Sequence, residues 1–81
     1  MWIRTENDNL VYASAVYIST FGKKQFYAVK GIVAGTDDEW LITACHTRKE
    51  AVDILNDIDV AIRVGKRLYD VKEENYETIK V

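Results

Sequence analysis

The sequence predicts an α+β fold in which an antiparallel β-meander of about four strands packs against one C-terminal α-helix. Two observations lead to this prediction. Helical spacing of apolar residues is confined to one stretch, residues 47–65, and the segments rich in Val, Tyr and Ile lie before or after it. The links between these segments are short, as is typical of strands that pair with antiparallel neighbours.

Four segments before the predicted helix combine high β-propensity with turn-forming residues at their ends: residues 1–4, 10–20, 25–34 and 40–45. Clusters of polar residues and glycine separate them, at residues 5–9, 22–24 and 35–39. The fourth segment runs almost directly into the helix. This order predicts a meander that is closed by the helix.

The helix has signals at both ends. Thr47 and Glu50 fit a capping box, in which a hydroxyl and a carboxylate three residues apart satisfy backbone N–H groups of the first turn. Gly65 stands where a left-handed C-terminal cap is expected. The apolar residues between them form one stripe that we expect to face the sheet: Ala51, Ile54, Leu55, Ile58, Ala61 and Ile62.

The chain after the helix divides into an apolar part and a charged part. Leu68, Tyr69 and Val71 predict a fifth strand at the edge of the sheet, or a segment that packs beside the helix. Residues 73–81 are mostly charged and predict a polar tail, with an arm that orders against another subunit as the alternative. We therefore divide the chain into a single domain at residues 1–72 and the tail.

The third predicted strand is apolar on both faces. One set of alternate residues on this strand runs from Phe26 to Ile32 and includes Lys30, whose charge indicates that the set faces outward. Phe26 and Ile32, at the two ends of the set, are nevertheless large and apolar. One helix covers one face of a sheet, so the second apolar face predicts a second copy of the chain or a sheet curled enough to bury both faces. A bulge at Gly31 that swaps the two faces is a third explanation.

The composition excludes several ways of stabilising a small domain. The chain has 81 residues, and a domain of this size buries about 60–65% of the surface of its unfolded chain. One cysteine excludes an internal disulfide, and without a Cys/His cluster structural zinc is disfavoured. Association with another copy or a partner is left as the stabilising interaction, so we expect a homo-oligomer.

The same composition narrows the binding partners and the cellular compartment that we expect for the protein. A net charge of −2 disfavours nucleic-acid binding, which usually needs a basic face. No run approaches the ~18 apolar residues of a membrane span, and the first residues lack the pattern of a signal peptide. A lone thiol is typical of the reducing cytoplasm, where we expect the protein.

No catalytic, metal-binding or cofactor-binding residues are predicted. Cys45 and His46 are neighbours in a strand and point to opposite faces, so they do not form a nucleophile and its base. The acidic turn at residues 37–39 lacks the ligand spacing of a calcium loop, and the glycines form no phosphate-binding motif. We therefore expect a protein that is not an enzyme and binds no cofactor.

Two groups of surface residues are candidates for binding. The first combines acidic and apolar side chains turned away from the predicted core and is a candidate protein contact: Asp53, Asp57, Val60 and Val64 on the helix, with Phe26 and Ile32 on the third strand. The second is basic and is a candidate anion site after the helix: Arg63, Lys66 and Arg67. The structural explanation of the first group is that single valines often lie on protein surfaces. The structural explanation of the second group is that basic residues after a helix complement its dipole.

The start of the chain and the helix together resemble one group of proteins. The chain opens Met1-Trp2-Ile3-Arg4, continues into a strand with Val16-Tyr17-Ile18, and carries the helical segment at residues 47–58. This pattern resembles small proteins encoded by phages and mobile elements of Gram-positive bacteria, which begin Met-Trp-Ile/Val-Arg and end in a helix of the form Thr-Lys-x-Arg-Ala-x-x-x-Leu-x-x-Ile. Lys49-Glu50-Ala51 departs from the usual Lys/Glu-Arg-Ala order. The resemblance implies a small cytoplasmic accessory protein and carries over no catalytic residue.

These observations lead to two functional hypotheses. The first is a non-catalytic accessory or inhibitor protein of phage or mobile-element type that binds a host protein and forms a homo-oligomer. The second is an oligomer that sequesters a small anionic ligand, such as a signalling nucleotide, with basic side chains brought together at subunit interfaces. A nucleic-acid accessory role is disfavoured by the charge balance.

Overall fold

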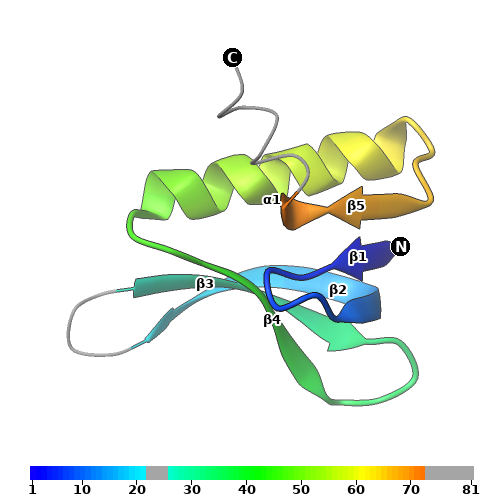
Figure 1. Cartoon of the computed structure of the whole chain (residues 1–81), viewed down its shortest axis with the longest axis horizontal. Helices are drawn as coiled ribbons and strands as arrows, with labels where there is room; N and C mark the ends of the chain where they lie inside the picture. Colours follow the sequence, from blue (N-terminus) through cyan, green and yellow to red (C-terminus); the bar gives the residue numbers. More distant parts are fainter. Residues whose placement is uncertain (22–25, 73–81) are drawn as a thin grey trace.

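The computed structural model describes residues 1–21 and 26–72, which form five strands and one helix (Figure 1). In chain order these elements are β1 (Trp2–Arg4), β2 (Leu10–Phe21), β3 (Phe26–Val33), β4 (Glu39–Cys45), α1 (Arg48–Arg63) and β5 (Leu68–Asp70). The predicted turn at residues 22–24 and the predicted tail at residues 73–81 lie outside the described residues. The predicted α+β fold, a meander followed by a helix, is confirmed.

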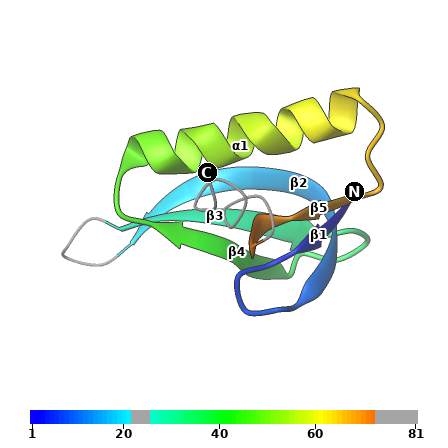
Figure 2. The same cartoon turned by 45° about the horizontal axis from the view of Figure 1, so that its top comes forward.

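The strands form one sheet in the order β4-β3-β2-β1-β5, and α1 lies across it (Figure 1, Figure 2). From β1 to β4 each strand pairs antiparallel with the next, as predicted. β5 pairs parallel to β1, with Ile3 opposite Tyr69, so the sheet is mixed. The helix provides the crossover that this parallel pair needs, because it carries the chain from one edge of the sheet to the other.

Two β-bulges bend the meander. The pairing of β2 with β3 shifts by one residue at Ser14, which becomes the extra residue of β2. The pairing of β3 with β4 shifts in the same way at Ile42. The bulge considered for Gly31 is therefore wrong, because Gly31 pairs regularly with residues on both neighbouring strands.

Gly31 instead has a packing role. A Cβ atom added to it would lie 3.2 Å from Cδ1 of Ile42 and 3.3 Å from Cβ of Ala13, and both of these side chains belong to the buried core. These distances leave little room for a side chain, so β3 approaches its neighbours closely here. A larger residue would displace the core where β2, β3 and β4 meet.

The sheet curls until the loop after β1 reaches β4. The N–H of Glu6 donates to the carbonyl of Ile42 at 2.9 Å, and a carboxylate oxygen of Glu6 accepts from the N–H of Ala44 at 2.9 Å. The loop is held by Thr5, whose buried hydroxyl accepts from the N–H of Asn9. These contacts occupy part of the backbone edge of β4, which would otherwise be open.

The curl also shields the outer face of β3. In the set predicted to face outward, Ala28 is buried, and Phe26, Lys30 and Ile32 are half-buried. Val29, on the other face, lies in the core as expected. For β3 the structure therefore favours the alternative of a curled sheet over a fully open apolar face.

α1 packs on the sheet through part of its predicted stripe. Ala51, Ile58 and Ala61 are buried, and Ile54 packs against the same core. The remaining buried members of this core come from the strands and from the residue after β5: Ile3, Ala13, Val29, Ile42, Cys45, Tyr69 and Val71. Ile62 also points toward the sheet, but a groove separates it from β2 and leaves it 55% exposed, so the prediction that it packs in the core is wrong.

Both ends of α1 form as predicted. Thr47 is the N-cap, and its hydroxyl accepts from the N–H of Glu50 at 3.2 Å. The carboxylate of Glu50 accepts from the N–H of His46 at 3.3 Å, which lies one residue before the position expected for a capping box. Gly65 has a φ of 78°, the left-handed conformation of a C-terminal cap.

Replacing Thr47 by alanine is expected to destabilise the domain by about 1 kcal/mol, because the N–H of Glu50 loses its acceptor. In a domain of this size the melting temperature then falls by about 4–8 °C. Thermal unfolding followed by circular dichroism measures the effect. Thr47→Ser keeps the acceptor and is the control, and an equal loss in both variants would contradict a role for the hydroxyl.

Candidate functional site

The backbone edge of β2 is only partly occupied. β1 pairs with residues 10–12 of β2, and backbone bonds between Met1 and Ala13 end this pairing. From Ala15 to Phe21, β2 pairs with β3, and no described strand lies on its other side (Figure 2). An antiparallel strand directs the N–H and C=O groups of alternate residues to each side. Every second residue of this stretch therefore presents backbone groups away from β3.

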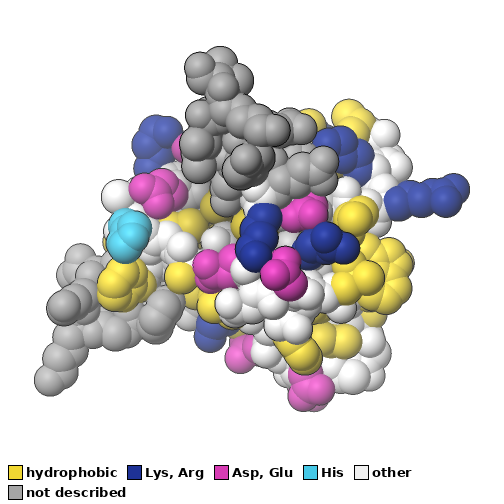
Figure 3. Space-filling model, in the orientation of Figure 1, with side chains coloured by type: hydrophobic (Ala, Val, Ile, Leu, Met, Phe, Trp, Pro, Cys, Tyr) yellow, Lys and Arg dark blue, Asp and Glu magenta, His cyan; other side chains and the backbone are white. Residues whose placement is uncertain are grey.

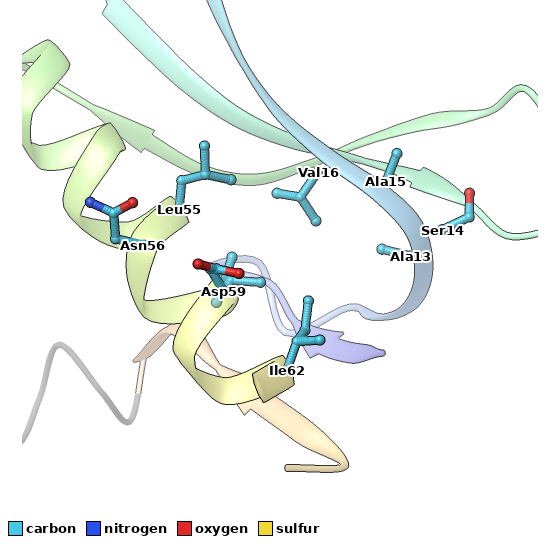
Figure 4. Close-up of a pocket in the computed structure, with 9 residues that line it drawn as sticks. Ala13, Ser14, Ala15, Val16, Leu55, Asn56, Asp59 and Ile62 are labelled. Atoms are coloured by element: carbon cyan, nitrogen blue, oxygen red, sulfur yellow. The ribbon is translucent and has the colours of Figure 1, made fainter. Parts of the chain in front are cut away.

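A groove of about 400 Å³ lies between this part of β2 and α1 (Figure 4). Val16 extends into it from β2, and Leu55 and Ile62 extend toward it from the helix. The side chains of Ser14 and Ala15 point away from the helix, so their backbone atoms line the groove. The groove thus combines apolar side chains with strand backbone.

Local sequence explains why the groove is open. The bulge at Ser14 bends β2, and the neighbouring alanines have side chains too small to fill the space between the bent strand and the helix. Ile62 remains 55% exposed and Leu55 half-buried, although both side chains are apolar. A chain inserted into the groove would remove this apolar surface from water.

The polar rim of the groove comes from α1. Asn56 and Asp59 line it, and Asn56 offers both donors and an acceptor. A carboxylate oxygen of Asp59 accepts from Nε of Arg63 at 3.2 Å, an ion pair between residues four apart on the helix. Because this charge is compensated, the groove favours a neutral polypeptide over a strongly charged ligand.

The helical residues predicted as a protein contact lie on the opposite flank of α1. Asp57, Val60 and Val64 border a hollow of about 180 Å³, together with residues that include Tyr69. Val60 and Val64 are 55% and 66% exposed. Asp53 lies one turn earlier and forms an ion pair with Lys49 at 2.9 Å. The hollow is less than half as large as the groove, and the predicted flank stays a second candidate contact.

Phe26 and Ile32, the other predicted contact residues, lie toward opposite ends of β3. The ring of Phe26 lies 5.5 Å from that of His46, measured between centroids. Ile32 sits between Ala15 and Glu39 of the neighbouring strands. The two residues therefore do not join into one surface.

The predicted basic cluster is spread around the end of α1. Arg63 pairs with Asp59 on the flank of the groove, whereas Lys66 borders the hollow on the opposite flank, beside Asp57. The carbonyl of Arg67 accepts from the N–H of Trp2 at 3.3 Å, which places this residue next to β1. This arrangement fits complementation of the helix dipole better than a single anion site.

Cys45 and His46 occupy different environments. Cys45 is 4% exposed and belongs to the core, whereas His46 is exposed at the entrance to α1. Burial, and after it the charges of Glu50 and Glu6, raises the pKa of the Cys45 thiol. The thiol therefore stays protonated at neutral pH, which disfavours a nucleophilic role.

Alkylation of Cys45 by iodoacetamide is expected to be about tenfold or more slower in the folded protein than in urea. Mass spectrometry of samples quenched over time measures the alkylation rate. Equal rates in the two states would show that the thiol is accessible in the fold.

The raised pKa of Cys45 also makes stability depend on pH. The contribution of this thiol to stability is present below its ordinary pKa of about 8.5 and is lost as the pH rises above that value.

The described residues contain no group of three or more His, Cys, Asp or Glu side chains placed to hold a metal ion. In the same part of the chain, no helix has the length and apolar character needed to cross a membrane. Comparison with protein-family models, with curated proteins and with solved structures found no match. The groove and the adjoining strand edge are therefore the features from which we infer a function.

Sequence patterns did not indicate the groove. Leu55 and Ile62 have the spacing of core residues, and no local signal separates them from Ile58. One sequence feature of the site does stand out, the run of small residues at 13–15 inside a strand that is otherwise rich in Val, Tyr and Ile. Such a run is compatible with a bulge or a close approach of another backbone, but it does not distinguish them.

Proposed function

We propose that this protein is a non-catalytic binding protein that recognises an extended segment of a partner protein in the groove between α1 and β2. The observation that supports this most strongly is the stretch of β2 after Ala13, where a backbone edge without a described partner strand adjoins an apolar groove. A strand from another chain fits both features, because its backbone pairs with the edge while alternate side chains enter the groove.

The expected affinity is modest. Each backbone hydrogen bond to β2 contributes about 0.5–1.5 kcal/mol, and covering the exposed apolar surface of Leu55 and Ile62 contributes about 2 kcal/mol. The loss of freedom of the bound segment offsets a large part of this gain. We therefore expect dissociation constants in the high micromolar range or weaker for short peptides.

The bound segment is expected to run antiparallel to β2. β1 occupies the neighbouring part of the same edge in that direction, so a guest strand would continue the line of β1. Antiparallel pairing is also slightly more stable per residue than parallel pairing. Apolar side chains at every second position would face Val16 and Ile62, and polar ones would face the solvent.

We further propose that the partner is a host protein and that the protein acts as an accessory factor or inhibitor of phage or mobile-element type. This part of the proposal is supported by the resemblance of Met1-Trp2-Ile3-Arg4 and of the helical segment to such proteins. Small size and a neutral, apolar groove suit a protein whose role is to occupy a strand-shaped segment of another protein.

Selection from a displayed library of random linear peptides tests the proposal and requires no purified partner. The selected sequences should share apolar residues at alternate positions. In synthetic versions, N-methylation at every second residue should abolish binding, because those N–H groups pair with β2, and methylation of the intervening residues should be tolerated. Fluorescence polarisation measures the affinities.

Two outcomes would contradict this function. One is that the immobilised protein enriches no sequence from the library. The other is that enriched peptides tolerate N-methylation equally at all positions, which would mean that their backbone does not pair with a strand.

A further inference from the structure

The sheet carries a second apolar surface on the side turned away from the core. Leu68, Trp2 and Tyr12 lie opposite one another across β5, β1 and β2. Leu10 lies on the same side, because it pairs with Arg4, two residues from Trp2 on β1. These four apolar side chains are 42–55% exposed. We call the surface made by Leu68, Trp2, Tyr12 and Leu10 the β1 face.

The residues between these positions confirm which side the β1 face occupies. Ile3, Val11 and Tyr69 alternate with its members along the three strands, and all three are buried. Successive side chains of a strand point to opposite sides, so the β1 face points to solvent. Figure 3 shows hydrophobic side chains gathered at the end of the molecule where β1 and the N-terminus lie in Figure 1.

The geometry of the β1 face is that of a small contact surface. The rings of Trp2 and Tyr12 lie 5.1 Å apart between centroids in an edge-to-face arrangement, which holds both in place. Arg4 and Asp70 border them and face each other at 3.7 Å. Because these two charges compensate each other, two copies of the face can meet without repulsion between like charges.

We infer that the β1 face is the contact between two copies of this chain, packed face to face around a two-fold axis. A two-fold contact brings the same patch of both copies together, and this patch is neutral and apolar enough to match itself. Trp and Tyr are also the side chains that most often provide the binding energy of such contacts.

The area of the β1 face sets the expected strength of the dimer. A Trp or Tyr side chain buries about 150–250 Å² when fully covered, so the exposed parts of Trp2 and Tyr12 offer about 100 Å² each. With the two leucines the face supplies roughly 300–400 Å² of apolar surface per copy, compared with about 800 Å² of total surface in a stable complex. We therefore expect a weak, reversible dimer with a dissociation constant above the micromolar range.

The dimer would leave the groove accessible in both copies. The β1 face lies on the outer side of the sheet, whereas the groove lies between β2 and α1, on the helix side. Two bound segments of one partner, or of a partner that is itself dimeric, would then be held together. Such a pairing raises the overall affinity without any new contact at the groove.

Sedimentation equilibrium from micromolar to millimolar protein tests this inference. The wild-type mass should rise from monomer to dimer over this range, and Tyr12→Lys/Leu68→Lys should remain monomeric. Val64→Lys changes an apolar side chain on the helix that is more exposed than Tyr12 or Leu68, and it should dimerise like the wild type. Peptide binding in the groove should be unchanged in the double variant, which separates this inference from the proposed function.

A second measurement needs no change in the β1 face. In a Trp40→Phe background, the fluorescence emission of Trp2 should shift to longer wavelength on dilution, because the ring leaves the contact. A wild-type protein that stays monomeric at millimolar concentration, a double variant that still dimerises, or emission that does not change on dilution would each overturn the inference.

Discussion

Replacing Ile58 by alanine is expected to lower the free energy of unfolding by about 2–5 kcal/mol. Ile58 is 2% exposed, packs in the core of the sheet and also lines the bottom of the groove, so the shorter side chain loses core contacts and leaves unfilled space beneath the helix. Small domains have about 5–15 kcal/mol of stability in total. The variant should therefore lose a large part of it, and urea unfolding followed by circular dichroism measures the loss.

Ile62→Ala is the matched control for this change. Ile62 is one turn away on the same helix and belongs to the same predicted stripe, but it is 55% exposed. Its truncation should change the free energy of unfolding by about 0.5 kcal/mol or less. If both variants lost the same amount of stability, Ile62 would pack in the core, and the groove would not be open.

Ile62→Lys is expected to weaken binding of a selected peptide by about tenfold or more while the domain remains folded. A lysine there would place a charged side chain in the groove, where a guest strand would have to cover it. The exposure of Ile62 makes the substitution tolerable for the fold. Fluorescence polarisation measures the affinity, and the unfolding curve verifies that the variant is folded.

Val60→Lys provides a close comparison. Val60 and Ile62 are both 55% exposed and two residues apart, but Val60 faces the hollow on the opposite flank of α1. The variant should bind the peptide as the wild type does, and so should Val60→Lys/Val64→Lys. If the double variant lost binding and Ile62→Lys kept it, the partner would occupy the helix flank predicted from the sequence.

Elements with strong local signals were predicted well. The ends of α1 follow from Thr47, Glu50 and Gly65, because capping and left-handed glycine are properties of a few neighbouring residues. The strands of the meander follow from β-propensity and short turns. β5 was predicted only as one of two alternatives. Its parallel pairing with β1 was not predicted, because the sequence of a three-residue strand is too short to indicate which strand it pairs with.

The candidate site depends on contacts that are distant in sequence. The edge of β2 is open because β1 covers only its first residues, and this follows from strand order and register rather than from composition. The exposure of Ile62 depends on how the bulge at Ser14 bends the strand beneath it. A helical wheel treats Ile62 and Ile58 alike, so the sequence led to a continuous core stripe instead of a groove.

Residue-resolved hydrogen exchange of β2, with and without a selected peptide, tests the central claim most directly. If a guest strand pairs with the edge of β2, alternate amides between Ala15 and Thr20 should exchange more slowly in the complex, because they gain acceptors. The amides already bonded to β3 should change little. Unchanged exchange in β2, or protection confined to the flank of α1 with Val60 and Val64, would contradict strand addition at the groove.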